Sequence, residues 1–294
     1  MNIDIASLTA SLVAKVEDYT REAYPAEHRK HLGYSLAGHE CTRYLWNTFR
    51  WLLLEEHEGR QRRLFQRGHR EEQQFIDLLR GAGWQVWDIN PQTGTQYRVT
   101  HMSGHIGGSL DAIVQPPGVN MAFIGEFKTH NEKSFTVLAG PKLTYTQMKQ
   151  GVRRSGGAGV LTAKPEHFIQ MSSYGAEYQL DYGLYCAVNK DTDELHFEIV
   201  PLDHGAGKYA TARLESVIGL EVPPRKLSET PTHFKCKLCH FTGICHSGEA
   251  PEKNCRSCRH ASPAAQGTWH CNLYKDDIPE TVIPDGCPAW ERIV

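Results

Sequence analysis

Hydrophobic and polar positions in the first third of the 294-residue chain follow a helical period. Apolar residues recur there at intervals of three and four positions, which places them on one face of a helix. The last of these segments is also the longest, and the sequence Gly-Ala-Gly stops it. The pattern predicts three helices, over residues 5–20, 41–56 and 62–83.

The period then changes from helical to alternating. Short segments in which every second position is apolar predict four strands, over residues 84–89, 96–102, 107–115 and 121–129. The sequence QPPGVN between the last two favours a turn and therefore a hairpin. Further along, the same criteria predict a helix over 166–180, a strand pair over 182–189 and 195–202, and a helix over 207–220.

This order of elements predicts an α/β protein with a central mixed β-sheet flanked by helices and a small cysteine-rich C-terminal tail. A dinucleotide-binding Rossmann fold is excluded, because no predicted strand-to-helix turn carries the glycine pattern of such a site. Internal repeats and low-complexity segments are absent from the sequence.

The composition suits a folded, water-surrounded protein. Hydrophobic residues make up 40% of the chain, enough for a packed core. No stretch approaches the roughly 20 apolar residues of a membrane helix. The first twenty residues carry acids and lack the basic-then-apolar order of a secretory leader. We therefore expect a cytoplasmic protein that does not bind a membrane.

Charge is balanced overall but unevenly distributed. The net charge of −2 does not favour attraction of the whole molecule to nucleic acid. Residues 60–70, however, contain five arginines, and residues 149–154 contain three further cations. Two solvated faces are the simpler interpretation. A basic stripe that contacts phosphates is the alternative.

One predicted strand carries an acid and a lysine on the same face. Alternation puts Glu126 and Lys128 on one side of the strand over 121–129. Pairing around the QPPGVN turn would bring Asp111 close to Glu126. Two close carboxylates repel each other, and a hard divalent cation removes that penalty. An exposed Glu126–Lys128 ion pair, with Asp111 in a turn, is the simpler alternative.

These residues resemble a known family. The segments GSLDAIV and IGEFKTH resemble the D…(D/E)-x-K signature of the PD-(D/E)XK nuclease superfamily. The segment RGHREEQQF resembles the helix that precedes the catalytic strands there. Gln170 and Tyr174 have the spacing of the Q-x3-Y motif of the RecB-like and phage exonuclease branch, on one helix face. Residues 187–200 resemble the hairpin that follows, so the likeness spans roughly residues 60 to 202 in family order.

The resemblance implies a restriction-endonuclease-like core and a Mg²⁺- or Mn²⁺-dependent DNA exonuclease of phage or recombination DNA processing. It assigns the metal to Glu72, Asp111 and Glu126, and the attacking water to Lys128. Gln170 and Tyr174 would position the scissile strand or the motif itself. The implied DNA contacts are Arg67, His69, Arg70, Arg153 and Arg154.

Three alternatives and two kinds of partner stay open at this point. An endonuclease of the same fold, a non-catalytic nucleic-acid-binding module and a redox iron–sulfur protein are the alternatives. The partner expected in each nuclease case is DNA, with a homo-oligomer or a recombination partner protein as further options. The segment 139–161 between the catalytic strand and the Q-x3-Y helix is a candidate for substrate contact.

Seven of the nine cysteines lie in the last 60 residues. Without an export signal, C-x2-C pairs favour metal over disulfides. Cys236, Cys239 and Cys245 need a fourth partner, and Cys41 is the candidate. This arrangement resembles the AddB-type iron–sulfur nuclease branch and implies a [4Fe-4S] cluster. Zinc on the same thiolates is the alternative.

A second, self-contained set predicts structural zinc. Its members are Cys255, Cys258, Cys271 and Cys287. His260 or His270 could replace one ligand, and a tail this short needs such a crosslink to fold. The resulting domain prediction is an N-terminal helical region (1–60), a nuclease core (61–220), an iron–sulfur cysteine segment (221–250) and a zinc-knuckle-like tail (251–294).

Overall fold

The computed structural model describes residues 4–294, so the first three residues of the predicted N-terminal region lie outside the described part. Its centre is a five-stranded sheet in the order β10-β9-β8-β7-β2. The strands are β2 (Gln85–Trp87), β7 (Ala112–Gln115), β8 (Phe123–His130), β9 (Tyr182–Asn189) and β10 (Leu195–Pro201). The β8–β9 pair is parallel and the other pairs are antiparallel. The predicted mixed sheet is therefore confirmed.

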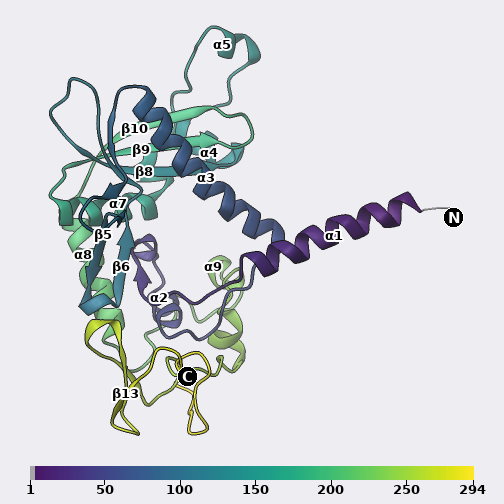
Figure 1. The fold of residues 1–294 in the computed structure, drawn as a ribbon, viewed down its shortest axis with the longest axis vertical. Helices are drawn as coiled ribbons and strands as arrows, with labels where there is room; N and C mark the ends of the chain where they lie inside the picture. Colours follow the sequence, from purple (N-terminus) through teal and green to yellow (C-terminus); the bar gives the residue numbers. More distant parts are fainter. Residues whose placement is uncertain (1–3) are drawn as a thin grey trace.

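Helices cover both faces of this sheet (Figure 1). On one face, Phe75 and Leu79 of α3 (Gly59–Gly81) pack with Phe127 and with the core cysteine Cys186. On the other face, α4 (Glu132–Ala139), α6 (Gly159–Ala163) and α7 (Pro165–Tyr178) pack against Tyr185 and its neighbours. Alternate side chains of β9 enter the two cores, as strand geometry requires. Helix α8 (His204–Ile218) packs on α7.

The predicted strand over 107–115 is wrong, because two strands occupy it. β6 (Ile106–Ser109) belongs to a second sheet with β1 (Leu32–Gly33) and β5 (Arg98–His101), whereas β7 belongs to the central sheet. The extended segment is interrupted at Leu110, between the two strands. Leu110 is fully buried, and its N–H donates a hydrogen bond to the Tyr97 carbonyl. Asp111 therefore lies in the break and not within a ladder.

The second predicted helix is also shorter than expected. α2 (Thr42–Phe49) ends before the predicted residue 56, and Trp51 takes a left-handed backbone with φ of 52°. This turn buries Trp51 and Leu52, and the Arg256 guanidinium lies 4.4 Å from the Trp51 ring centre. Tertiary burial of these side chains outweighs the helical period of the local sequence.

The N-terminal helix α1 (Ile5–Ala23) projects from the body in Figure 1. Ion pairs of its last turns, Glu17 with Arg63 and Arg21 with Glu58, connect it to the start of α3. Within the described part of the chain, no helix combines the length and the apolar character needed to cross a membrane.

The cysteine-rich C-terminal part packs against the rest of the protein. It contains α9 (Phe234–Lys237) and a three-stranded sheet of β11 (Ala261–Pro263), β12 (Trp269–Cys271) and β13 (Asp276–Ile278). Arg256 is almost fully buried, with its guanidinium near the rings of Phe49, Trp51 and Trp269. One hydrophobic cluster thus includes side chains of α2 and of the tail.

The remaining short elements lie in connections. A two-stranded ladder of β3 (Ile89–Asn90) and β4 (Thr95–Gln96) follows β2. A five-residue helix, α5 (Tyr145–Lys149), lies in the long connection between α4 and α6. The sequence pattern predicted none of these three elements, because each is too short to show a period.

Candidate functional site

The pairing of β7 with β8 assembles an acidic site around one lysine. Ala112 lies opposite Gly125, so Asp111 and Glu126 are the next positions of the two strands. The Lys128 Nζ atom is 2.5 Å from Oε1 of Glu126 and 3.5 Å from Oδ2 of Asp111. The Glu126 side chain is 0% exposed. The alternative of an exposed surface ion pair is therefore wrong.

Asp111 is held by the backbone of the neighbouring strand. Its Oδ2 accepts a hydrogen bond of 2.7 Å from the N–H of Phe127. That N–H is free to bond a side chain because the β7 ladder begins only at Ala112. The strand break that the sequence pattern missed is thus what orients the Asp111 carboxylate toward Lys128.

The site carries more negative than positive charge. Burial raises the pKa of Glu126 to about 7; Lys128 opposes this shift and Asp111 adds to it. Burial also raises the pKa of Glu72, on α3, with a further contribution from Asp111. For Lys128 burial acts to lower the pKa, but Asp111 and Glu126 outweigh it and the net shift is upward. One ammonium therefore faces three carboxyl groups.

Helix α7 supports the acidic site from behind. The Gln170 amide Nε2 donates to Oε2 of Glu126 at 3.5 Å. One turn later, the Tyr174 hydroxyl donates to the Ser109 carbonyl at 3.1 Å, directly before the strand break. A Cβ at Gly108 would collide with that hydroxyl, so a larger residue there would displace the Tyr174 side chain. The predicted Q-x3-Y pair thus contacts Glu126 on β8 and the end of β6, two residues before Asp111.

The donor set fits a hard divalent cation, although it is not preassembled around one. In residues 4–294, no group of three or more His, Cys, Asp or Glu side chains stands ready to hold a metal ion. Here the Lys128 ammonium lies between Asp111 and Glu126. Carboxylate oxygens are the ligands that Mg²⁺ and Mn²⁺ prefer. The raised pKa of Glu126 reflects a charge penalty that a second cation would relieve.

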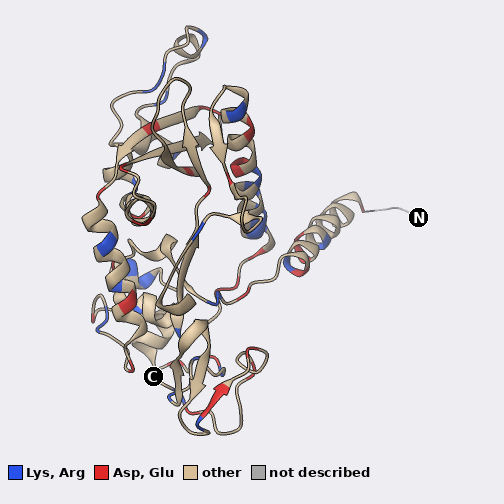
Figure 2. Ribbon diagram, turned by 60° about the vertical axis from the view of Figure 1, so that its left-hand side comes forward, with Lys and Arg blue, Asp and Glu red and all other residues tan. Residues whose placement is uncertain are grey.

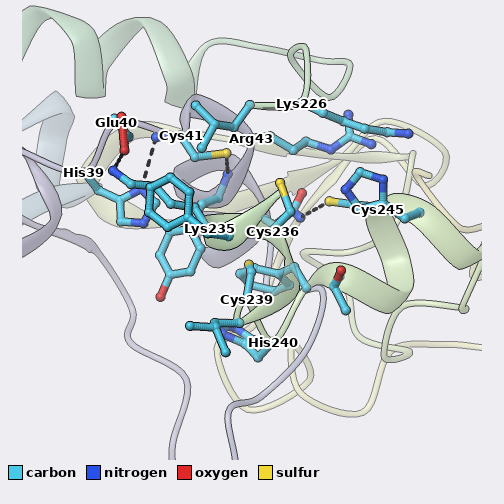
Figure 3. Close-up of a pocket in the computed structure, with 18 of the residues that line it drawn as sticks. His39, Glu40, Cys41, Arg43, Lys226, Lys235, Cys236, Cys239, His240 and Cys245 are labelled. Carbon is cyan, nitrogen blue, oxygen red and sulfur yellow. Dashed lines mark hydrogen bonds and ion pairs between the residues drawn. The ribbon is translucent and has the colours of Figure 1, made fainter. Parts of the chain in front are cut away.

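A separate pocket of about 420 Å³ collects the first set of cysteines (Figure 3). Cys41, Cys236, Cys239 and Cys245 all line it. Cys41 caps the N-terminus of α2, where its sulfur accepts a hydrogen bond from the N–H of Tyr44. The Asn47 amide donates to the sulfur of Cys245 at 3.6 Å, although the two residues are 198 positions apart. Burial raises the pKa of Cys239, and the other three thiols add to the shift. Folding therefore brings this sequence-predicted set together.

The tail cysteines also lie near one another. Burial raises the pKa of Cys255 to about 11, with further contributions from Cys287, Cys258 and Cys271. All nine cysteines are free thiols. Of the nearby histidines, His270 is paired with Asp277 at 3.1 Å. The buried Nε2 of His260 lies 3.3 Å from Glu291 but forms no hydrogen bond, so the alternative of His260 as a ligand stays a prediction.

Comparison with known proteins finds only remote structural likeness. No family model and no curated protein matches the chain. Among solved structures, an alkaline exonuclease from Laribacter hongkongensis is 13% identical, with 65% of this chain and 87% of that chain covered and a TM-score of 0.40. The same enzyme in complex with dAMP is 13% identical over 67% and 90% of the two chains, with a TM-score of 0.39. A protein named SSO0001 is 17% identical over 81% and 96%, with a TM-score of 0.40. Likeness this remote does not assign a function to the chain.

A buried histidine–tyrosine network beside Lys128 was not predicted from the sequence. The Tyr185 hydroxyl lies 2.8 Å from Nδ1 of His167 and 2.9 Å from Nε2 of His130. Burial lowers the pKa of His167 to about 3 and that of His130 to about 4, and the Lys128 charge contributes to both shifts. Both imidazoles are therefore neutral at pH 7. A signal existed: His130 has the strand parity of Lys128, and His167 lies three positions before Gln170.

The predicted DNA-contacting cations have different surroundings. On α3, His69 is 67% exposed and its Nδ1 lies 3.8 Å from Glu72, Arg70 is exposed, and Arg67 is partly exposed with a hydrogen bond to the Lys190 carbonyl. Arg153 is exposed.

Arg154 requires a correction. Its side chain is 4% exposed, and its guanidinium pairs with Glu132 at 2.9 Å and with Glu194 at 2.5 Å. The prediction of Arg154 as a DNA contact is wrong, because these carboxylates already occupy the guanidinium.

Proposed function

We propose that the protein is a divalent-metal-dependent DNA nuclease, and specifically an exonuclease. The observation that carries the proposal is the buried Glu126 carboxyl, which shares Lys128 with Asp111 at a strand break and receives the Gln170 amide. A protein that needed only a stable fold would gain nothing from a buried, incompletely neutralised carboxyl. Perturbed ionisable groups of this kind are typical of catalytic sites.

In the proposed mechanism, Glu72, Asp111 and Glu126 would hold Mg²⁺ or Mn²⁺. Such an ion, when bound, lowers the pKa of a water ligand and stabilises charge on a phosphoryl oxygen. Lys128, released from its pairing with the acids, orients the attacking water and offsets negative charge as the water oxygen bonds to phosphorus and one P–O bond breaks. Gln170 keeps Glu126 in place, and Tyr174 holds the segment before Asp111.

For the first cysteine set we propose a [4Fe-4S] cluster on Cys41, Cys236, Cys239 and Cys245, with zinc on the same thiolates as the alternative. The support is that all four thiols line one pocket, and that burial and the other three thiols raise the pKa of Cys239, a penalty that bound cations relieve. Iron and sulfide analysis with a visible absorption spectrum separates the two metals.

For the tail we propose structural zinc on Cys255, Cys258, Cys271 and Cys287. The support is that burial, together with the other three thiols, raises the pKa of Cys255. We also propose the division of the chain into a helical region, a nuclease core, an iron–sulfur segment and a zinc tail. A cytoplasmic site of action and a role in phage or recombination DNA processing are further parts of the proposal. A homo-oligomer or a recombination partner protein also stays a prediction.

The test is digestion of one plasmid in linear and closed-circular form with Mg²⁺ or Mn²⁺, using wild type and Asp111→Asn. The asparagine keeps an acceptor for the Phe127 N–H but removes the charge. We expect loss of linear DNA, and a fall in rate of about 10²-fold or more in the variant. Digestion of both forms would make the protein an endonuclease. An unchanged rate in Asp111→Asn would refute the site.

A further inference from the structure

A long connection between α4 and α6 forms an arm, defined here as residues 140–158, which stands away from the body around α5 (Figure 1). The segment 133–165, which contains the arm, has no Asp or Glu. It has six cations: Lys133, Lys142, Lys149, Arg153, Arg154 and Lys164. In a chain with a net charge of −2 this is a strong local excess, and Figure 2 shows the arm with blue segments and no red.

The base of the arm is held firmly. Arg154 is paired with Glu132 and Glu194, and its side chain is almost fully buried. It therefore anchors the segment that returns from the tip of the arm to the body. The two ends of the arm also lie in close contact with each other. A Cβ at Gly140 would collide with the Ser155 carbonyl. A Cβ at Gly157 would collide with the Leu138 carbonyl. The arm is therefore a projection whose base is fixed to the body by close contacts.

The tip has its own local order and exposes apolar groups. Thr144 and Gln147 form a capping box at the start of α5. Tyr145 is 69% exposed, and Met148 and Val152 are exposed as well. The Lys149 ammonium lies 4.8 Å from the centre of the Tyr145 ring. An aromatic face and a cation are thus presented together, turned away from the protein core.

The chemistry of this tip matches a nucleic-acid strand. Phosphates attract acid-free clusters of Lys and Arg, and an exposed aromatic ring stacks on an unpaired base. A protein partner would suit the apolar side chains, but the unbroken positive charge favours a polyanion. The base of the arm also lies close to the end of the strand that carries Glu126 and Lys128, because Arg154 pairs with Glu132, two residues after β8 ends.

We propose that the arm binds single-stranded DNA, with Lys142, Lys149 and Arg153 on phosphates and Tyr145 stacked on a base. The proposal rests on the proposed function for the identity of its ligand and adds a binding surface outside the catalytic residues. Arg154 takes no part in the contact; its role is to fix the base.

The experiment measures fluorescence anisotropy of a labelled 20-nucleotide single strand with the full chain in buffer without added Mg²⁺ or Mn²⁺, so that hydrolysis is suppressed while the proposed structural zinc stays bound. Tyr145→Ala should weaken binding roughly tenfold, since a stacked base contributes about one such factor. The triple variant Lys142→Gln, Lys149→Gln, Arg153→Gln should also bind less salt-dependently. The slope of log affinity against log salt concentration should become less steep by about 2. Matched controls on α8 are Tyr209→Ala, where the tyrosine is 74% exposed, and the exposed Lys208→Gln; both should bind as wild type.

A second readout separates the arm from the catalytic proposal. Hydrolysis of bis(p-nitrophenyl) phosphate with Mn²⁺ requires only the acidic site, so the arm variants should keep the wild-type rate and Asp111→Asn should lose it. The arm proposal would be overturned if the arm variants bound DNA as tightly as the wild-type protein does, or if the wild-type protein bound no DNA. Neither outcome would change the conclusion drawn from the hydrolysis assay. Weaker DNA binding by the arm variants without any hydrolysis by wild type would support the arm and reject the nuclease.

Discussion

At the scale of single residues, Glu126 shows how the site strains the fold. A fully buried carboxyl is costly to ionise, and Lys128 offsets only part of that cost because Asp111 competes for the same ammonium. The pKa of Glu126 is raised from 4.5 to about 7, so the folded state binds the proton more tightly than the unfolded state does. The free energy of unfolding therefore falls as the pH rises from 4.5 through 7.

This sign leads to a stability prediction for the metal-free protein. Glu126→Gln should raise the free energy of unfolding at pH 8 by on the order of 1–3 kcal/mol, because the amide cannot ionise. The gain should disappear below about pH 3.5, where wild type is protonated in both states. Urea unfolding in EDTA at the two pH values checks it, with the exposed Glu229→Gln as control. A gain of equal size at both pH values would contradict the prediction.

At the scale of elements, the connections decide more than the regular segments do. The break between β6 and β7 turns Asp111 toward Lys128, and α7 spans that break through Tyr174 and Ser109. The base of the arm depends in the same way on Arg154, which pairs with Glu132 and Glu194. The hydrogen bond from Arg154 is the largest cause that lowers the pKa of Glu132, to about 2.

Arg154→Met should therefore loosen the base of the arm. The variant leaves two partly buried carboxylates without their guanidinium, at an expected cost of about 2 kcal/mol, or a fall of about 4–8 °C in the unfolding midpoint. Because the pKa of Glu132 is lowered in the folded state, this contribution is complete above pH 4.5 and is lost as the pH falls toward 2. Thermal unfolding at pH 7 and pH 3 checks it. A deficit that grows on acidification would refute the ion-pair account.

At the scale of the whole molecule, distant parts of the chain meet in the cysteine pocket. Cys41 comes from the start of α2, whereas Cys236, Cys239 and Cys245 come from the region around α9. A bound cluster would close a loop of nearly 200 residues between them, and such closure stabilises the fold chiefly by restricting the unfolded chain.

Removal of one ligand should thus affect the entire fold. Cys41→Ser should abolish iron binding at this pocket and lower the free energy of unfolding by about 3–5 kcal/mol, by the loop-closure estimate. Iron content and thermal unfolding measure the two effects. Cys186→Ala, at a buried thiol outside both sets, is the control and should keep its iron. Equal iron content in the two variants would exclude Cys41 as a ligand.

What the sequence by itself determined is local and periodic. Alternation predicted β8, β9 and β10 and the shared face of Glu126 and Lys128, and helical spacing predicted α7 with Gln170 and Tyr174 on one side. A period is a property of neighbouring residues, so it can be read without knowledge of the fold.

Only the tertiary structure decided the features that depend on distant segments. The early end of α2 follows from burial of Trp51 against the tail, and the orientation of Asp111 follows from a free N–H on β8. The occupation of Arg154 by Glu132 and Glu194 has the same origin. Burial and charge pairing are properties of contacts between segments, and no local pattern encodes which segments will meet.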